Sequence, residues 1–219
     1  MKHFQRELDK IKKMILSLGA IVEQRVERIK QAIADRNVDI AKEVIHLDYE
    51  IDEMEVEIEE ECLKVIALHQ PVATDLRFLV AVIKINNDLE RIGDQAVNIA
   101  QRLVLIAKRP VAPFRFDYSV MADKAEAMLR MSLDSLVNQD IDVAIKVLQM
   151  DDDVDNIKDE AYDRIKQALV DGVTTDIGYM INLLLISRHI ERLADHATNI
   201  AEEVVYMIEG EIVRHGRLE

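Results

Sequence analysis

The feature of this 219-residue sequence that most limits its possible folds is an internal repeat. Eleven residues, Glu90 to Ala100, recur 101 positions later as Glu191 to Ala201, and seven of the eleven are identical. An earlier segment, Val44 to Asp52, recurs 103 positions later as Val147 to Asp155. Repetition at a fixed period indicates a duplicated structural unit. We therefore predict two similar halves, and the two-residue difference in spacing predicts a loop whose length differs between them.

Each half is expected to be helical. The sequence contains only six glycines and three prolines, and residues 114–219 contain no proline. Between Val44 and Val65 apolar residues recur every three or four positions, as one face of a helix requires. We predict an all-α fold of two tandem, pseudo-symmetric three-helix bundles, residues 1–109 and 114–219, joined by the linker Arg109–Pro113. The six helices are predicted near residues 5–34, 38–68, 74–107, 116–137, 141–170 and 174–209.

Polar residues and one glycine indicate where these helices begin and end. Asn37, Thr74, Asp140 and Thr175 stand where a side chain could accept an unpaired backbone N–H at a helix start. Gly210 is suited to end the last helix. The third helix of each half is expected to be long and central. In the first half, its residues that need burial on several sides are Ile85, Leu89, Ile92, Ile99 and Leu103.

The composition excludes several classes of function. The 28 Lys and Arg residues against 42 Asp and Glu residues leave a formal net charge of −14, which argues against nucleic acid as a partner. The single cysteine, Cys62, fits a reducing compartment. Met1 is followed by charged residues rather than by the apolar core of a signal peptide, and no apolar run is long enough for a membrane span. We expect a soluble, cytoplasmic protein.

The repeated segments place acidic residues in one pattern in both halves. The third helix carries Glu, Asp and Asn at i, i+4 and i+8, which project within about 80° of one another. The second helix carries two Asp residues at i and i+4, so the carboxylates converge if the two helices pack side by side. Clustered carboxylates repel one another, and a bound cation would remove that penalty. The predicted ligands are Asp48, Asp52, Glu90, Asp94 and Asn98 in the first half, and Asp151, Asp155, Glu191, Asp195 and Asn199 in the second.

The identity of the metal stays open. Oxygen ligands suit Mg²⁺, Mn²⁺, Ca²⁺ or iron, and zinc is a further candidate. A plain solvated acidic face is the alternative, because nine of the fourteen residues from Asp48 to Glu61 are acidic. Arg91 and Arg192 directly follow the glutamates and explain part of the pattern by ion pairing. Recurrence of the pattern on two helices of both halves favours metal binding.

Another metal motif has less support. Glu43 and His46 have the Glu-x-x-His spacing of di-iron bundles. The equivalent residues of the second half are Lys146 and Gln149, which cannot provide the same ligands. We therefore interpret the Glu43–His46 spacing as coincidence.

Two histidines flank the acidic face of the second half. His189 and His196 correspond to Asp88 and Gln95 in the first half, so we interpret them as surface groups or as groups that support the ligands. Cys62 lies on the apolar face of its helix and is most simply a core residue. The sequence contains no nucleophile with an obvious base, no Gly-rich phosphate loop and no zinc-type Cys/His spacing. We predict that the protein is not an enzyme.

These segments together resemble the PhoU family. The resemblance lies in Leu89 to Ala100, in Ile190 to Glu202, in the preceding segment Gln70 to Arg77 (Gln-Pro-Val-Ala-Thr-Asp-Leu-Arg) and in the tail Tyr206 to His215. It covers essentially the whole chain. The second half departs from the pattern, because Gly172 to Gly178 lacks the proline and the arginine. A role of Arg77 is therefore not extended to the second half.

The resemblance implies a function in phosphate regulation. PhoU proteins are accessory proteins of phosphate-specific transport that act in the cytoplasm as negative regulators of the phosphate-starvation response. They link the ATPase subunit of a phosphate ABC transporter to a sensor histidine kinase, and they resemble paired three-helix bundles, often dimeric, with multinuclear metal sites. The partners expected for this chain are therefore that ATPase, that kinase and a second copy. Contact with a membrane is expected only through these proteins.

A second class of function stays open at this point. It is a di-metal carboxylate enzyme, or a metal-storage protein, built on a helical bundle. Such an enzyme needs open coordination positions inside the bundle core. The acidic residues here lie on helix faces without matched Glu-x-x-His pairs, which favours the regulatory adaptor.

Overall fold

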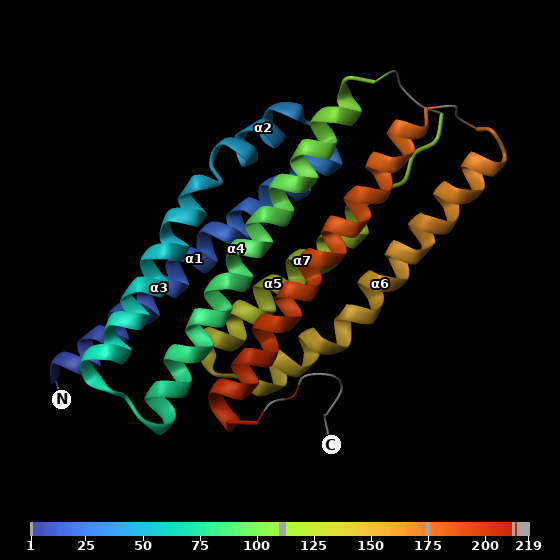
Figure 1. Ribbon diagram of the computed structural model, residues 1–219. Coiled ribbons are helices and arrows are strands. Elements are labelled where there is room, and N and C mark those ends of the chain that lie inside the picture. The colour runs from blue at the N-terminus through green and yellow to red at the C-terminus, as the bar shows by residue number, and fades with distance from the viewer. Residues whose placement is uncertain (1, 110–112, 174–175, 212, 214–219) are drawn as a thin grey trace.

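In a computed structural model of the chain, which describes residues 2–109, 113–173, 176–211 and 213, every regular element is a helix (Figure 1). The all-α prediction is confirmed. Within these ranges no helix is long and apolar enough to span a bilayer. The helices are α1 (Lys2–Asp35), α2 (Val38–His46), α3 (Tyr49–His69), α4 (Ala73–Ala107), α5 (Ser119–Asn138), α6 (Ile141–Val170) and α7 (Ile177–Glu209).

The helices form two halves that pack along α4 and α7. The first half contains α1, α2, α3 and α4, and the second contains α5, α6 and α7. The long helices α4 and α7 lie antiparallel in the middle, with α3 and α6 at opposite edges (Figure 1). The predicted arrangement of two tandem helical units is confirmed, with the second predicted helix of the first unit divided into α2 and α3. The predicted boundary residues 109 and 114 stay a prediction, because residues 110–112 lie outside the described ranges.

The central position of α4 follows from its sequence. Ile85, Leu89, Ile92 and Ile99 are at most 1% exposed, and Leu103 is partly buried. These residues lie on several sides of the helix, so α4 needs neighbours on each of them. It contacts α1, α2 and α3 of its own half and α7 of the other. Because apolar residues on several sides of α4 are packed against its neighbours, the polar residues of α4 lie along the boundaries between adjacent helices.

The helix predicted over 38–68 is wrong as one continuous element. It is divided into α2 and α3 at Leu47 and Asp48, where the Ile51 N–H donates to the Asp48 carbonyl in a tightened turn. The counterpart in the second half, α6, has no break. Apolar spacing could not reveal the break, because Val44 and Ile51 on either side of it remain buried on the same face. Asp48 therefore stands at the start of α3, in helical conformation and without a side-chain hydrogen bond that caps the helix.

Three of the predicted helix ends are confirmed. Asn37 accepts the N–H groups of α2, Asp140 accepts that of Val143, and Gly210 ends α7 in the left-handed conformation. The prediction for Thr74 is wrong, because α4 begins one residue earlier without a side-chain cap. Thr175 lies outside the described residues, and α7 begins after Asp176, which accepts the Tyr179 N–H. The predicted start at 116 is also wrong, because α5 begins at Ser119.

The missing arginine of the second half has a structural reason. Arg77 at the start of α4 lies against Gly210 at the end of α7, and a Cβ at position 210 would collide with its guanidinium. Arg109, just after α4, lies against Gly178 at the start of α7 in the same way. The repeat distance of 101 separates position 77 from position 178, and it also separates position 109 from position 210. Glycine at position 178 thus leaves room for the Arg109 guanidinium, which a side chain there would displace.

Candidate functional site

The predicted carboxylates of the first half come together between α3 and α4. Asp52 and Asp94 are electrostatic neighbours of Asp48. Burial, followed by the charges of these two carboxylates, raises the pKa of Asp48 from 3.8 to about 6. Gly93 allows the close approach of the helices, because a Cβ there would lie 2.9 Å from Ile51 Cδ1 and 3.8 Å from Asp48 Oδ1.

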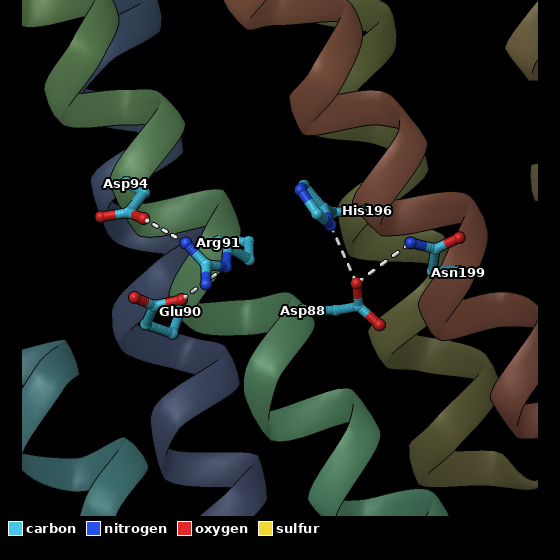
Figure 2. A network of polar contacts seen from close by, with 6 residues as sticks. All are labelled: Asp88, Glu90, Arg91, Asp94, His196 and Asn199. Carbon is cyan, nitrogen blue, oxygen red and sulfur yellow. Dashed lines mark hydrogen bonds and ion pairs between the residues drawn. The ribbon is translucent and has the colours of Figure 1, made fainter.

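Glu90 and a residue that the sequence analysis missed, Glu55, complete this group. Burial raises the pKa of Glu90, and the neighbouring charges of Asp94, Glu55 and Asp52 raise it further. The pKa of Glu55 is likewise raised by burial. Arg91 borders the group, with its guanidinium 3.3 Å from both Glu90 and Asp94 (Figure 2). We call Asp48, Asp52, Glu55, Glu90 and Asp94 the first cluster.

The equivalent carboxylates of the second half come together between α6 and α7. Burial raises the pKa of Asp195 to about 6, assisted by the charges of Glu191, Asp151 and Asp155. The pKa of Asp151 is raised by burial and by Asp155. The Thr198 hydroxyl donates to Asp151 Oδ1 at 3.4 Å. We call Asp151, Asp155, Glu191 and Asp195 the second cluster.

A lysine distinguishes the second cluster from the first. Lys158 Nζ donates to Asp155 Oδ1 at 2.8 Å and to Glu191 Oε1 at 3.1 Å. The hydrogen bond to Asp155 raises the pKa of the lysine above its ordinary value. Lys158 stands 103 positions after Glu55, at the repeat distance of this helix. The same place thus holds an ammonium group in one half and a carboxylate in the other.

The two predicted asparagine ligands behave differently from the carboxylates. Asn199 Nδ2 donates to Asp88 Oδ1 on α4 at 3.1 Å, so its side chain is directed toward the other half (Figure 2). Asn98 is partly buried on α4. The structure therefore groups the eight predicted carboxylates into two clusters and gives Asn199 a contact between the halves.

The two histidines make matched contacts between α4 and α7. His196 Nδ1 lies 2.8 Å from Asp88 Oδ1, and His189 Nδ1 lies 2.9 Å from Gln95 Oε1 (Figure 2 shows the first pair). Burial lowers the pKa of His189 to about 4, so its neutral ring donates to the glutamine oxygen near pH 7. Interpreting these histidines as surface groups is wrong, because both are partly buried where the two halves meet.

Two further sequence candidates have ordinary roles. Glu43 forms an ion pair with Arg28 of α1, which accounts for that residue of the Glu-x-x-His spacing without a metal. Cys62 is fully buried in the core, and burial raises the pKa of its thiol to about 12. The thiol is therefore held in the protonated, unreactive form.

One pocket lies away from both clusters, at the end of the molecule where the halves are joined. It has a volume of about 650 Å³, and its lining includes Arg36, Arg109, Arg115 and Arg164. Arg109 is paired with Asp176, and Arg164 is paired with Glu160 and stacked on Phe116. Much of the positive charge of this pocket is therefore balanced by neighbouring carboxylates.

The donor set of the first cluster fits a cation that prefers oxygen. Glu90 Oε2 is buried and accepts no hydrogen bond, although Arg91 is close. A carboxylate oxygen in that state lacks a partner that a hard cation would supply. In the part of the chain that the structure describes, no three His, Cys, Asp or Glu side chains are already arranged to hold a metal ion. Repelling carboxylates would have to turn toward a cation to form such a site.

A duplicated all-α protein with an acidic cluster in each half is the class that this fold and site define. A family model described as "PhoU domain" matches the chain twice, over residues 15–103 and 118–204. The two matches cover most of α1 to α4 and most of α5 to α7. The chain belongs to the PhoU family.

Similar proteins agree with this assignment over almost the whole chain. A protein of Aquifex aeolicus named phosphate-specific transport system accessory protein PhoU homolog is 38% identical over 222 residues, which cover 100% of this chain and 98% of that protein. The crystal structure of PhoU from Pseudomonas aeruginosa is 32% identical, covers 95% of this chain and 100% of its own, and has a TM-score of 0.90. The phosphate transport system regulatory protein PhoU from Streptococcus pneumoniae has a TM-score of 0.87 at 27% identity. It covers 96% of this chain and 99% of its own.

Proposed function

We propose that this chain is an accessory protein that regulates phosphate transport. The observation that carries the proposal is the match, over essentially its full length, to relatives named phosphate-specific transport system accessory proteins. The chain carries two matches to the PhoU domain and spans 98% of the Aquifex aeolicus relative. The finer part of the proposal is that the protein acts in the cytoplasm, linking the ATPase subunit of a phosphate ABC transporter to a sensor histidine kinase. In ample phosphate this link keeps starvation genes repressed.

The surface of α3 supports a function through protein contacts. Tyr49, Val56 and Leu63 are each more than half exposed and stand seven residues apart, so they form one apolar stripe along the helix. Exposed glutamates, including Glu53 and Glu60, border this stripe. An apolar strip with acidic borders suits a partner that presents apolar and basic groups. We propose that this stripe meets a transport partner or a second copy of the chain.

The net charge of −14 also bears on how the protein reaches a membrane. Anionic lipid headgroups would repel the acidic edges formed by α3 and α6. We therefore propose that membrane association depends on protein partners, and that it weakens as salt screens the charges. A regulatory role of this kind needs no catalytic group, and we propose that the chain is not an enzyme.

We propose further that oxygen-preferring cations bind among the clustered carboxylates. The raised pKa values of Asp48, Glu90 and Asp195 support this, because burial, followed by the charges of neighbouring carboxylates, disfavours the ionised form of each group. A divalent cation such as Mg²⁺ or Mn²⁺, or iron, would hold α3 against α4 by accepting ligands from both. Its role in this proposal is to order the helices and the surface that they present.

The test is a strain that lacks this gene, grown in ample phosphate with a reporter on a starvation promoter. The reporter should be active without the gene and silent when the natural chain is restored. Val56→Asp should fail to silence it, whereas Val120→Asp, the same change at an equally exposed valine of α5, should succeed. A reporter that stays silent in the deletion strain, together with no binding of the ATPase or the kinase at low salt, would contradict the proposed function.

A further inference from the structure

The two clusters differ most at a single helix position. Position 55 on α3 and position 158 on α6 are equivalent by the repeat distance of 103. The buried residues around them confirm the alignment, since Ile51 and Val154 are equivalent and both are 1% exposed. Yet one position holds Glu55 and the other holds Lys158. The substitution reverses the charge at the centre of an otherwise repeated acidic group.

Both residues interact electrostatically with the glutamate of the neighbouring long helix. Glu55 is an electrostatic neighbour that raises the pKa of Glu90 on α4. Lys158 donates instead to Glu191 on α7, and it also donates to Asp155 on its own helix. The ammonium thus joins carboxylates of two helices, which is what a bridging metal ion would do. Its side chain is 29% exposed, so the pairs are partly shielded from water.

We infer that a metal ion binds only at the first cluster and that the Lys158 ammonium takes its place in the second. The first cluster has five carboxylates; Arg91 pairs with Glu90 and Asp94 of its own helix at 3.3 Å, and Arg25 is an electrostatic neighbour of Asp48. The second has four carboxylates and a lysine hydrogen-bonded to two of them. A protonated lysine has no lone pair to offer a metal and repels it, whereas Glu55 adds a further oxygen ligand. This inference rests on the metal-binding part of the proposed function.

The experiment measures Mn²⁺ binding to the full chain after removal of metal with a chelator. Bound Mn²⁺ is counted from the loss of the free-ion signal in electron paramagnetic resonance. Asp52→Asn/Asp94→Asn should weaken Mn²⁺ binding by about tenfold or more, because ligand charge sets affinity. Asp155→Asn/Asp195→Asn should leave the binding of the natural chain unchanged. Circular dichroism and thermal unfolding verify that each variant folds.

Exchange of the two distinguishing residues gives the decisive comparison. Lys158→Glu should create additional Mn²⁺ binding that Asp155→Asn/Asp195→Asn removes, and Glu55→Lys should remove the binding of the natural chain. Lys166→Glu, at an exposed position of the same helix, is the matched control for the charge change. Equal loss of binding from mutation of either cluster, or no more binding to Lys158→Glu than to Lys166→Glu, would overturn the inference. Absence of Mn²⁺ binding in every protein would overturn the metal proposal as well.

Discussion

The contact between Gly93 and Ile51 sets the separation of α3 and α4 at the first cluster, and a substitution there has a calculable effect. A Cβ at position 93 would lie 2.9 Å from Ile51 Cδ1, which is closer than carbon atoms normally approach. The second half has Ala194 and Val154 at the equivalent positions. Relative to the first half, α7 thus has one more side-chain carbon at position 194, and α6 has one fewer at position 154. We expect Gly93→Ala and Ile51→Val to compensate each other in the same way.

Two opposing terms decide the effect of Gly93→Ala. Replacing glycine by alanine inside a helix stabilises the protein by about 1 kcal/mol. Overpacking a buried contact costs about 1–3 kcal/mol, so the net destabilisation is about 1 kcal/mol. Ile51→Val alone costs about 1 kcal/mol, because it removes a buried methyl group. In the double variant the collision disappears, and we expect unfolding free energy close to that of the natural chain, with a coupling of about 1–2 kcal/mol.

Urea unfolding followed by circular dichroism measures these free energies. A chelator should be present throughout, so that metal binding does not add to the stability of some variants. Ile58→Val, at a second fully buried isoleucine of α3, is the matched control and should be additive with Gly93→Ala. Stabilisation of the protein by Gly93→Ala by the full amount of about 1 kcal/mol expected for alanine in a helix would refute the proposed contact between a Cβ at position 93 and Ile51. Additive effects of Gly93→Ala and Ile51→Val would refute it as well.

Three other results are expected. In chelator, the folded-state pKa of about 6 for Asp48 and Asp195, above the ordinary 3.8, means that the native state holds these protons more tightly. The unfolding free energy, measured by urea unfolding, should therefore fall as the pH rises from about 4 to about 7. After discounting for solvent screening, we expect each of the two residues to contribute about 1 kcal/mol to this fall. The fall should be smaller in Asp48→Asn. Removal of metal should lower the melting temperature, and Asp94→Ala/Asp195→Ala should contain less metal by elemental analysis than the natural chain purified without chelator. Cys62 should react with a thiol reagent only after denaturant is added, because its pKa is about 12 and its side chain is buried.

Most of the fold could be predicted from the sequence because helices of this length leave a periodic pattern. Val44, Ile51 and Ile58 appeared on one apolar face and are buried together. The division of that helix at Asp48 could not be predicted, because one tightened turn keeps the buried face continuous. Helix starts near 74 and 116 were misplaced by one and three residues, since a helix can begin without a side-chain cap when packing holds its first turn.

The candidate site could be predicted only where its residues share a helix or a repeated pair of helices. Spacing brought Glu90 and Asp94 onto one face, and repetition related them to Glu191 and Asp195. The contact of Asn199 with Asp88 depends on how α4 meets α7, which periodicity does not contain. The roles of Glu55 and Lys158 were missed for a different reason. The alignment that pairs these two residues is visible in the sequence, but a repeat is recognised by residues that its two copies share, and these two differ in type.

The differences between the repeats are as informative as the identities, because α4 and α7 pack against each other antiparallel. In such a pair, the start of α4 lies against the end of α7. Because α7 repeats α4, the residue that Arg77 meets, at position 210, is the repeat equivalent of Arg109 at the other end of α4. Identical repeats would therefore place an arginine at 210 against Arg77, and an arginine at 178 against Arg109. Two guanidinium groups would then collide and repel one another at each end. Gly178 and Gly210 avoid both collisions. Divergence at the contact between the halves thus leaves room for Arg77 and Arg109, whereas the charge reversal at position 158 lies between α6 and α7 of one half, away from that contact.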